Sequence, residues 1–193
     1  MIRSFSLGPM VMLLAVTATV NPAEARRKAA KPAPAEIAKS VPIPGGGKAL
    51  ELGKYGDWGA YSTQGAKGKV CYALGQPKDR QPNGLKRDPG YLFISTRPGE
   101  GVHGEVSFIF GFPLKESAPD AVAEAGAASF GLITKGENAW VRNAAEESQL
   151  VDAMRKTGKL VIKVPSKKGN ATSDTYSLAG LSQALDRVKK ECP

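Results

Sequence analysis

Few side chains in this sequence are of the types that carry out acid–base chemistry. His103 is the only histidine, and it lies just before a strand-like run of residues. A histidine that acts as a general base needs a carboxylate that orients its ring, and Glu105 lies too near His103 in sequence for this role to be judged from the sequence. A turn histidine at the entrance of a strand would have the same local sequence. We interpret His103 as such a turn residue, predict no catalytic residue, and keep an envelope-polymer hydrolase that uses Asp57, His103 or Glu105 as an alternative.

The sequence also lacks the residue patterns of metal and cofactor sites. One histidine and two cysteines are too few for the usual transition-metal site if the cysteines are paired with each other. No acidic calcium loop, phosphate-binding loop, dinucleotide fingerprint or nucleophile elbow occurs. We therefore expect no metal, no cofactor and no enzymatic activity.

The first 25 residues have the order of parts of a secretory signal peptide. Arg3 precedes an apolar run from Leu7 to Val20, and Ala23-Glu24-Ala25 supplies the small residues that a signal peptidase recognises. The run is shorter than the roughly 20 residues of a membrane-spanning helix. We predict cleavage after Ala25 and a periplasmic or secreted protein without a transmembrane segment in the mature chain. An uncleaved anchor is the alternative.

Residues 26–48 form a basic segment rich in alanine, proline and lysine. Six of its side chains are basic and one is acidic, so it carries much of the net charge of +9. Too few large apolar groups are present to offset the entropy of ordering it, so we expect a disordered linker. It serves either as a solvated spacer or as an arm that contacts anionic lipid or lipopolysaccharide. That contact would involve Arg26, Arg27, Lys28 and Lys31.

Cys71 and Cys192 are the only cysteines. In an oxidising compartment a small even number of cysteines indicates a disulfide. A catalytic thiol would need a nearby histidine or a Cys-x-x-Cys spacing, and the sequence has neither. We predict a structural bond between Cys71 and Cys192, which would join an early strand to a C-terminal helix.

Residues 49–193 are expected to form a single β-rich domain. The clearest strand pattern covers residues 105–112, where Val106, Phe108, Phe110 and Phe112 share one face. Residues 76–89 contain three prolines and are expected to form a surface loop. Further strands are predicted at residues 55–63, 69–74, 91–97, 129–134, 138–142, 159–164 and 172–178.

Two helices are predicted in the C-terminal half. One begins at a capping box of Asn143 and Glu146 and ends at Gly158. The other carries an apolar stripe made of Leu181, Ala184, Leu185 and Val188. The fold class is therefore mainly β (α+β), an antiparallel β-sandwich or barrel-like domain that carries two helices.

Several polar and aromatic positions have a structural and a functional interpretation. Asp57 either caps a turn or pairs with a cation such as Lys69, and we expect Trp58 in the core. Trp140 is expected in the core, with an exposed anchor for a partner as the alternative. Charges at a hairpin tip usually serve solvation, and we give this interpretation to Lys167 and Lys168.

Several short phrases, taken in order, resemble one known family. They are Tyr55-Gly56-Asp57-Trp58, Val70-Cys71-Tyr72-Ala73-Leu74 followed by Pro77, Ala139-Trp140, Leu150-Val151-Asp152-Ala153-Met154 before Gly158-Lys159-Leu160, and Asp174-Thr175-Tyr176-Ser177-Leu178-Ala179-Gly180-Leu181. From about Lys54 to Cys192 the chain resembles the invasion-associated locus B family of exported bacterial proteins. The resemblance implies a mostly β, non-enzymatic domain of the periplasm or cell envelope, with no catalytic motif. The founding example of the family is implicated in host-cell invasion.

The leading hypothesis is a binding or interaction protein of the envelope. Its partners would be anionic envelope lipid, lipopolysaccharide or an envelope protein, and we expect no nucleic-acid partner because an exported protein does not normally meet nucleic acid. Besides the hydrolase, a secreted virulence factor that contacts host cells remains an alternative, which differs from the leading hypothesis in its location.

Overall fold

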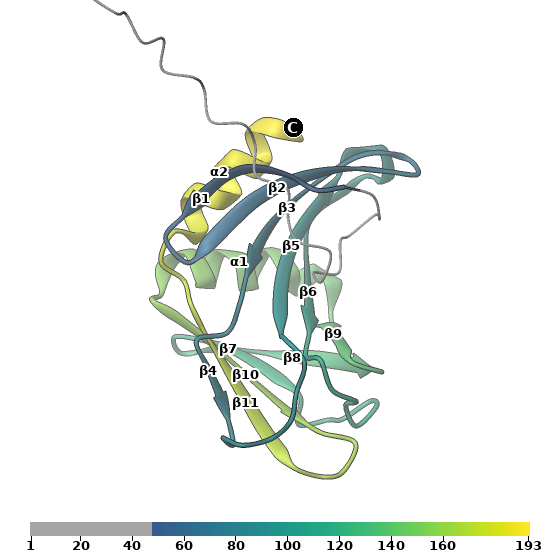
Figure 1. Ribbon diagram of the computed structural model, residues 1–193, viewed down its shortest axis with the longest axis vertical. Coiled ribbons are helices and arrows are strands. Elements are labelled where there is room, and N and C mark those ends of the chain that lie inside the picture. The colour runs from purple at the N-terminus through teal and green to yellow at the C-terminus, as the bar shows by residue number, and fades with distance from the viewer. Residues whose placement is uncertain (1–47) are drawn as a thin grey trace, which may run out of the picture. The chain divides into compact units, whose positions relative to one another are not determined.

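The structure is a computed structural model that describes residues 48–193 (Figure 1). The predicted signal peptide (1–25), the cleavage site after Ala25 and the basic side chains Arg26, Arg27, Lys28 and Lys31 lie outside the described residues. Two helices come late in the chain, α1 at Glu147–Lys156 and α2 at Leu181–Glu191. The strands are β1 (Leu50–Tyr55), β2 (Trp58–Gly65), β3 (Gly68–Gly75), β4 (Asp79–Gln81), β5 (Tyr91–Arg97), β6 (Val102–Ile109), β7 (Val122–Ala125), β8 (Ala128–Lys135), β9 (Asn138–Val141), β10 (Lys159–Pro165) and β11 (Ala171–Ser177).

The described strands form one antiparallel sheet that folds back on itself. Its order is β1-β2-β3-β5-β6-β9-β8-β7-β10-β11-β4. β4 lies at the opposite end of this order from β1, yet only residues 76–78 separate it from β3. The amide of Asp57, between β1 and β2, donates to the Ala179 carbonyl just after β11, at 3.0 Å. The two halves of the sheet therefore face each other, which confirms the predicted mainly β fold with two late helices.

The main core lies between the two halves of the sheet and the helices. Trp58 and Ala60 of β2, Leu92 and Ile94 of β5, and Phe108 of β6 point to this inner side and are fully or almost fully buried. The second half of the sheet contributes Leu132, Leu160, Ile162 and Tyr176. The predicted stripe of α2 is confirmed, because its four apolar side chains are all buried in this core. Alternation along each strand thus directs one side of the sheet inward.

A second buried cluster occupies the opposite, outer face of β2, β3 and β5. It is made of Tyr61, Val70, Tyr72, Tyr91 and Phe93, together with Ala49. These residues alternate with the inner-face residues along their strands, so they point away from the main core. Tyr61 stacks on Tyr72 with ring centroids 5.5 Å apart, and Tyr72 contacts Phe93 at 5.5 Å. The first half of the sheet is therefore buried on both faces.

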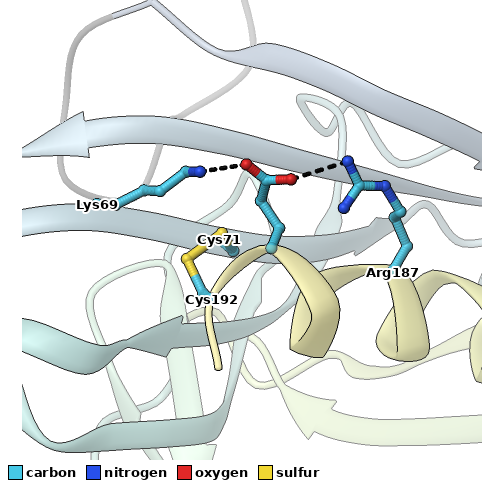
Figure 2. Close-up of a disulfide and its surroundings, with 5 residues drawn as sticks. Lys69, Cys71, Arg187 and Cys192 are labelled. Carbon is cyan, nitrogen blue, oxygen red and sulfur yellow. Dashed lines mark hydrogen bonds and ion pairs between the residues drawn. A yellow bond between two sulfur atoms is a disulfide. The ribbon is translucent and has the colours of Figure 1, made fainter.

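The predicted disulfide is confirmed. Cys71 on the inner face of β3 is bonded to Cys192, directly after α2, with the two Cα atoms 6.0 Å apart. Beside the bond, the Glu191 carboxylate accepts hydrogen bonds from Lys69 of β3 and Arg187 of α2 (Figure 2). A covalent bond and the charged hydrogen bond from Lys69 thus attach the last turn of α2 to the same strand, while the Arg187–Glu191 hydrogen bond lies within α2.

The Glu191 cluster gives the domain a pH-dependent contribution to stability. The hydrogen bonds from Lys69 and Arg187 lower the pKa of Glu191 below its usual value of 4.5. A lowered folded-state pKa means that this stabilisation is present above about pH 4.5 and is lost as the pH falls through the folded-state pKa. We expect Glu191→Gln to lower the free energy of unfolding by less than about 1 kcal/mol at neutral pH. At a pH below the folded-state pKa of Glu191, the substitution should have no effect. Urea unfolding at neutral pH, in acid and at pH values between them tests this prediction. Glu116→Gln is the control, since Glu116 is exposed and has no ion pair among the described residues. If Glu191→Gln lowers the free energy of unfolding by the same amount at every pH, the prediction is contradicted.

The structure differs from the predicted elements at several places. The predicted strand 55–63 is a hairpin, in which β1 ends at Tyr55 and β2 begins at Trp58. The predicted loop 76–89 contains β4, which pairs with β11. The short strand β7, rich in alanine, was not predicted. β6 ends at Ile109, although the burial of Phe110 and Phe112 continues the predicted alternation.

Candidate functional site

Asp57 and Trp58 lie in the turn that leads from β1 to β2. The Trp58 ring is 2 % exposed and its Nε1 donates to the Ser177 carbonyl at 2.9 Å, which confirms its placement in the core. Asp57 pairs with Lys78 and not with Lys69, whose partner is Glu191. The hydrogen bond from Lys78 lowers the pKa of Asp57. Asp57 is therefore a paired carboxylate, which is unsuited to donate a proton near neutral pH.

The three residues of the hydrolase alternative do not come together. Asp57 lines an open cavity of about 460 Å³ beside the β1–β2 turn. His103 lines a different cavity, between the start of β6 and the two helices. Glu105 lies on the outer face of β6 and accepts a hydrogen bond from Arg97 at 2.7 Å. No pair of these side chains shares a cavity, so they have no common point at which a substrate could react.

Trp140 is not a core residue. Its neighbours in β9, Ala139 and Val141, point into the main core, so Trp140 points to the outer face, where it is half-buried. It pairs across the sheet with Ile133, which is 44 % exposed.

Residues 48–193 contain no group of three histidine, cysteine or acidic side chains placed to hold a metal ion.

A buried ion cluster organises the loop between β4 and β5. Asp174 of β11 is 1 % exposed, and the Nε of Arg80 in β4 donates to both of its carboxylate oxygens at 3.0 and 3.1 Å. Burial raises the pKa of Asp174, and the hydrogen bond and charge of Arg80 oppose this rise. Arg87 lies 3.6 Å from the same carboxylate with its side chain 6 % exposed. Asp174 thus provides the counter-charge for two guanidinium groups.

Both guanidinium groups also hold backbone carbonyls around the loop. Arg80 donates to Asp88 O at 2.8 Å and to Phe110 O at 2.6 Å. Arg87 donates to Arg80 O at 2.7 Å and to Pro82 O at 3.0 Å, and it lies over the Phe112 ring at 5.7 Å. Because the donors of both arginines are engaged within the protein, this part of the chain is fixed in place despite its many polar residues.

A cavity of about 340 Å³ lies next to this cluster, and we call it the hairpin cavity. It is bounded by the loop after β4, by the segment that follows β6, and by the turn between β10 and β11. Leu85, Phe112 and Pro113 supply its apolar surface, and three lysines, Lys86, Lys167 and Lys168, surround them. The volume is at the lower end of the range for small-molecule sites.

The turn that carries two of these lysines is held by hydrogen bonds. Ser166 N donates to Asn170 O at 2.8 Å, and Asn170 N donates to Ser166 Oγ at 3.0 Å. The amide of Lys167 donates to Pro113 O at 2.9 Å, which joins the turn to the opposite wall of the cavity. Two walls of the cavity are therefore joined by a hydrogen bond within the protein itself.

The charge of the hairpin cavity is of one sign. No carboxylate lines it, and none of its three lysines forms an ion pair with the described residues. A neighbouring hollow shares Lys86 and Arg87 with the hairpin cavity and is also lined by Asp88 and Glu137. Three exposed ammonium groups around an apolar surface favour a ligand that has both an anionic group and an apolar part.

Sequence reasoning missed this site. Lys167 and Lys168 were interpreted as solvated charges at a hairpin tip, and Lys86 as part of a surface loop. The lysines of the turn are about 80 residues from Lys86, and only the β4–β11 pairing brings the two segments together.

Comparison with family models, curated proteins and solved structures gives no match, so the resemblance stated from the sequence remains a prediction. No helix within residues 48–193 has the length and apolar character needed to cross a membrane.

Proposed function

We propose that the chain is an exported, non-enzymatic binding protein of the bacterial envelope, and that the hairpin cavity binds the anionic head group of an envelope lipid. The observation that carries the proposal is the arrangement of Lys86, Lys167 and Lys168 around an apolar surface without a carboxylate. None of the three lysines forms an ion pair with the described residues, so their charge is available to an anionic ligand.

Two further observations support the envelope as the place of action. The Cys71–Cys192 disulfide fits a protein that folds in an oxidising compartment. The sequence before residue 48 has the composition expected for a signal peptide and a basic arm. In this proposal the arm adds charge close to the lipid surface, while the cavity selects the head group.

The proposal predicts that lysines of the cavity contribute more to lipid binding than other lysines. We would measure co-sedimentation of the purified protein with vesicles of phosphatidylcholine alone and of phosphatidylcholine mixed with phosphatidylglycerol. We expect binding only to the mixed vesicles, and a roughly hundredfold loss of affinity when Lys86, Lys167 and Lys168 are all changed to Gln, at about 1 kcal/mol for each basic residue near the surface. Added salt should weaken the binding of the unchanged protein.

A matched variant separates the cavity from net charge. Lys135, Lys156 and Lys159 are also exposed and lie outside the hairpin cavity, so changing these three to Gln removes the same charge. A third variant replaces Arg26, Arg27, Lys28 and Lys31 with Gln and reports on the arm. Equal losses from both lysine sets would show that the cavity has no special part, and absence of binding to the mixed vesicles would overturn the proposal.

A further inference from the structure

The only histidine and one of the two cysteines line the same cavity. The cavity has a volume of about 430 Å³ and lies between β5, β6 and the two helices, and we call it the helix cavity. His103 of β6 and Cys192, directly after α2, both belong to its lining. The two residues are distant in sequence, so only the fold brings them to one place.

A β-bulge in β6 turns His103 towards this cavity. Thr96 of β5 opposes His103, and Gly104 is left out of the pairing between the two strands. Gly104 has a φ of 76°, a conformation that glycine adopts without strain. With a regular pairing, His103 would oppose Arg97 and point to the outer face of the sheet. The bulge therefore directs the histidine to the inner face.

The disulfide lies on the same face and in the same row. Cys71 of β3 opposes Thr96 of β5, and Thr96 opposes His103 of β6, so the three residues follow one another across the sheet. Directly opposite side chains have their Cβ atoms about 5 Å apart. The Thr96 hydroxyl is therefore close enough to donate a hydrogen bond to a thiolate at Cys71.

Only one sulfur of the disulfide faces the helix cavity. Cys192 is 3 % exposed and lines the cavity, whereas Cys71 is 0 % exposed and is absent from the described lining. Thiol–disulfide exchange begins when a thiolate attacks one of the two sulfurs, and access helps to decide which of them is attacked. A thiol that enters the cavity therefore meets Cys192 first.

The charges of the helix cavity indicate the kind of thiol that it accepts. Asp152 lines it from α1 and Lys189 lines it from α2, and neither forms an ion pair with the described residues. Arg155, which also lines it, is paired with Asp186. A free carboxylate and a free ammonium group on two different helices favour a ligand that carries both complementary charges.

We infer that the helix cavity admits a small thiol of the amino-acid type, with an ammonium and a carboxylate group, and that this thiol exchanges with the disulfide at Cys192. His103 accepts the proton of the incoming thiol, which must become a thiolate before it attacks. The new bond forms to Cys192 Sγ, and the electron pair of the old bond leaves with Cys71 Sγ. The Cys71 thiolate then takes up a proton. One disulfide replaces another, so the step needs no oxidant.

The exchange would release the last turn of α2 from its covalent attachment to β3. The Lys69–Glu191 hydrogen bond then remains between these two elements. The disulfide would thus have a second role besides stabilising the fold. The inference does not depend on the lipid-binding function.

Reduction of the unchanged disulfide by cysteine tests the route through the cavity. The rate is followed by mass spectrometry after an acid quench. Ser148 lines the helix cavity from α1, so Ser148→Trp should slow the reduction severalfold, and His103→Gln should also slow it. Gln149→Trp is the matched control, since Gln149 is exposed on the same helix and does not belong to the described lining. An unchanged rate in Ser148→Trp or His103→Gln would overturn the inference.

Two single-cysteine variants show which sulfur is reached. Cys71→Ala and Cys192→Ala lose the same disulfide, so each serves as the control for the other. We expect the Cys192 thiol of Cys71→Ala to form a mixed disulfide with cystine about tenfold faster than the Cys71 thiol of Cys192→Ala. Equal rates in folded variants, as judged by circular dichroism, would contradict the inference. If the variants do not fold, the rates measured on the intact disulfide decide.

A series of thiols tests the charges. Cysteamine lacks the carboxylate of cysteine and 3-mercaptopropionate lacks its ammonium group, and each rate is divided by the rate of the same thiol with a free disulfide in solution. Cysteine should then be the fastest of the three. Lys189→Gln should remove its advantage over cysteamine, and Lys190→Gln, at an exposed position outside the described lining, should not. Equal normalised rates for the three thiols would show that the cavity does not select the amino-acid type.

Discussion

Asp174→Ala should lower the free energy of unfolding by about 3–5 kcal/mol, because removing one partner of a buried ion pair leaves the other charge without compensation. Asp174 is the only carboxylate that pairs with Arg80 and Arg87 among the described residues, and both side chains are largely buried, at 18 % and 6 % exposure. The measurement is urea unfolding at neutral pH, followed by circular dichroism.

Asp186→Ala is the matched control for this prediction. Asp186 also pairs with an arginine, Arg155, but its side chain is 71 % exposed. We expect this substitution to cost below about 1 kcal/mol, as for other pairs at the surface. Asp174→Asn keeps the size of the side chain but removes its charge, so it should lie closer to Asp174→Ala than to the unchanged protein. Similar small costs for Asp174→Ala and Asp186→Ala would show that the buried cluster does not stabilise the fold.

The second large effect is expected from the disulfide. The bond closes a loop whose ends are 121 residues apart in sequence. Closing a loop of this length removes entropy from the unfolded chain worth about 5 kcal/mol at room temperature. We therefore expect reduction of the protein, or replacement of both cysteines by alanine, to lower the free energy of unfolding by about that amount.

The disulfide prediction includes a control and a local readout. Dithiothreitol should shift the urea midpoint of the unchanged protein and leave that of the double alanine variant unchanged. Hydrogen exchange should increase first in the last turn of α2, which the disulfide attaches to β3 together with the Lys69–Glu191 hydrogen bond (Figure 2). If the unfolding midpoint does not respond to the reductant, the loop argument is wrong for this protein.

The elements that sequence reasoning predicted well are those whose signal lies in neighbouring residues. β5 matches the predicted residues 91–97, and the apolar stripe of α2 is visible as a spacing of three and four residues. The cysteine pair was predictable because only two cysteines exist. The fold class follows from these same local patterns.

What could not be predicted depends on contacts between distant residues. β4 consists of Asp79, Arg80 and Gln81, which carry no strand signal of their own. The strand forms because Arg80 hydrogen-bonds to Asp174, 94 residues later, and because β4 pairs with the edge of β11. The same pairing brings Lys86 near the β10–β11 turn. The hairpin cavity could therefore not be predicted, because it also depends on a contact between segments distant in sequence. Asp57 does pair with a cation, which was one of its two interpretations, but the cation is Lys78, between β3 and β4, and not the suggested Lys69.

The position of β4 also constrains the order in which the domain can assemble. β4 leaves β3 after only three residues, but its pairing partner, β11, comes near the end of the chain (Figure 1). The disulfide partner of β3 comes later still, at Cys192. Contacts this far apart in sequence are characteristic of domains that fold in milliseconds to seconds, not microseconds. A growing chain therefore carries an unpaired β4 until β11 arrives and a free Cys71 thiol until Cys192 arrives, and through that interval both are exposed to non-native contacts.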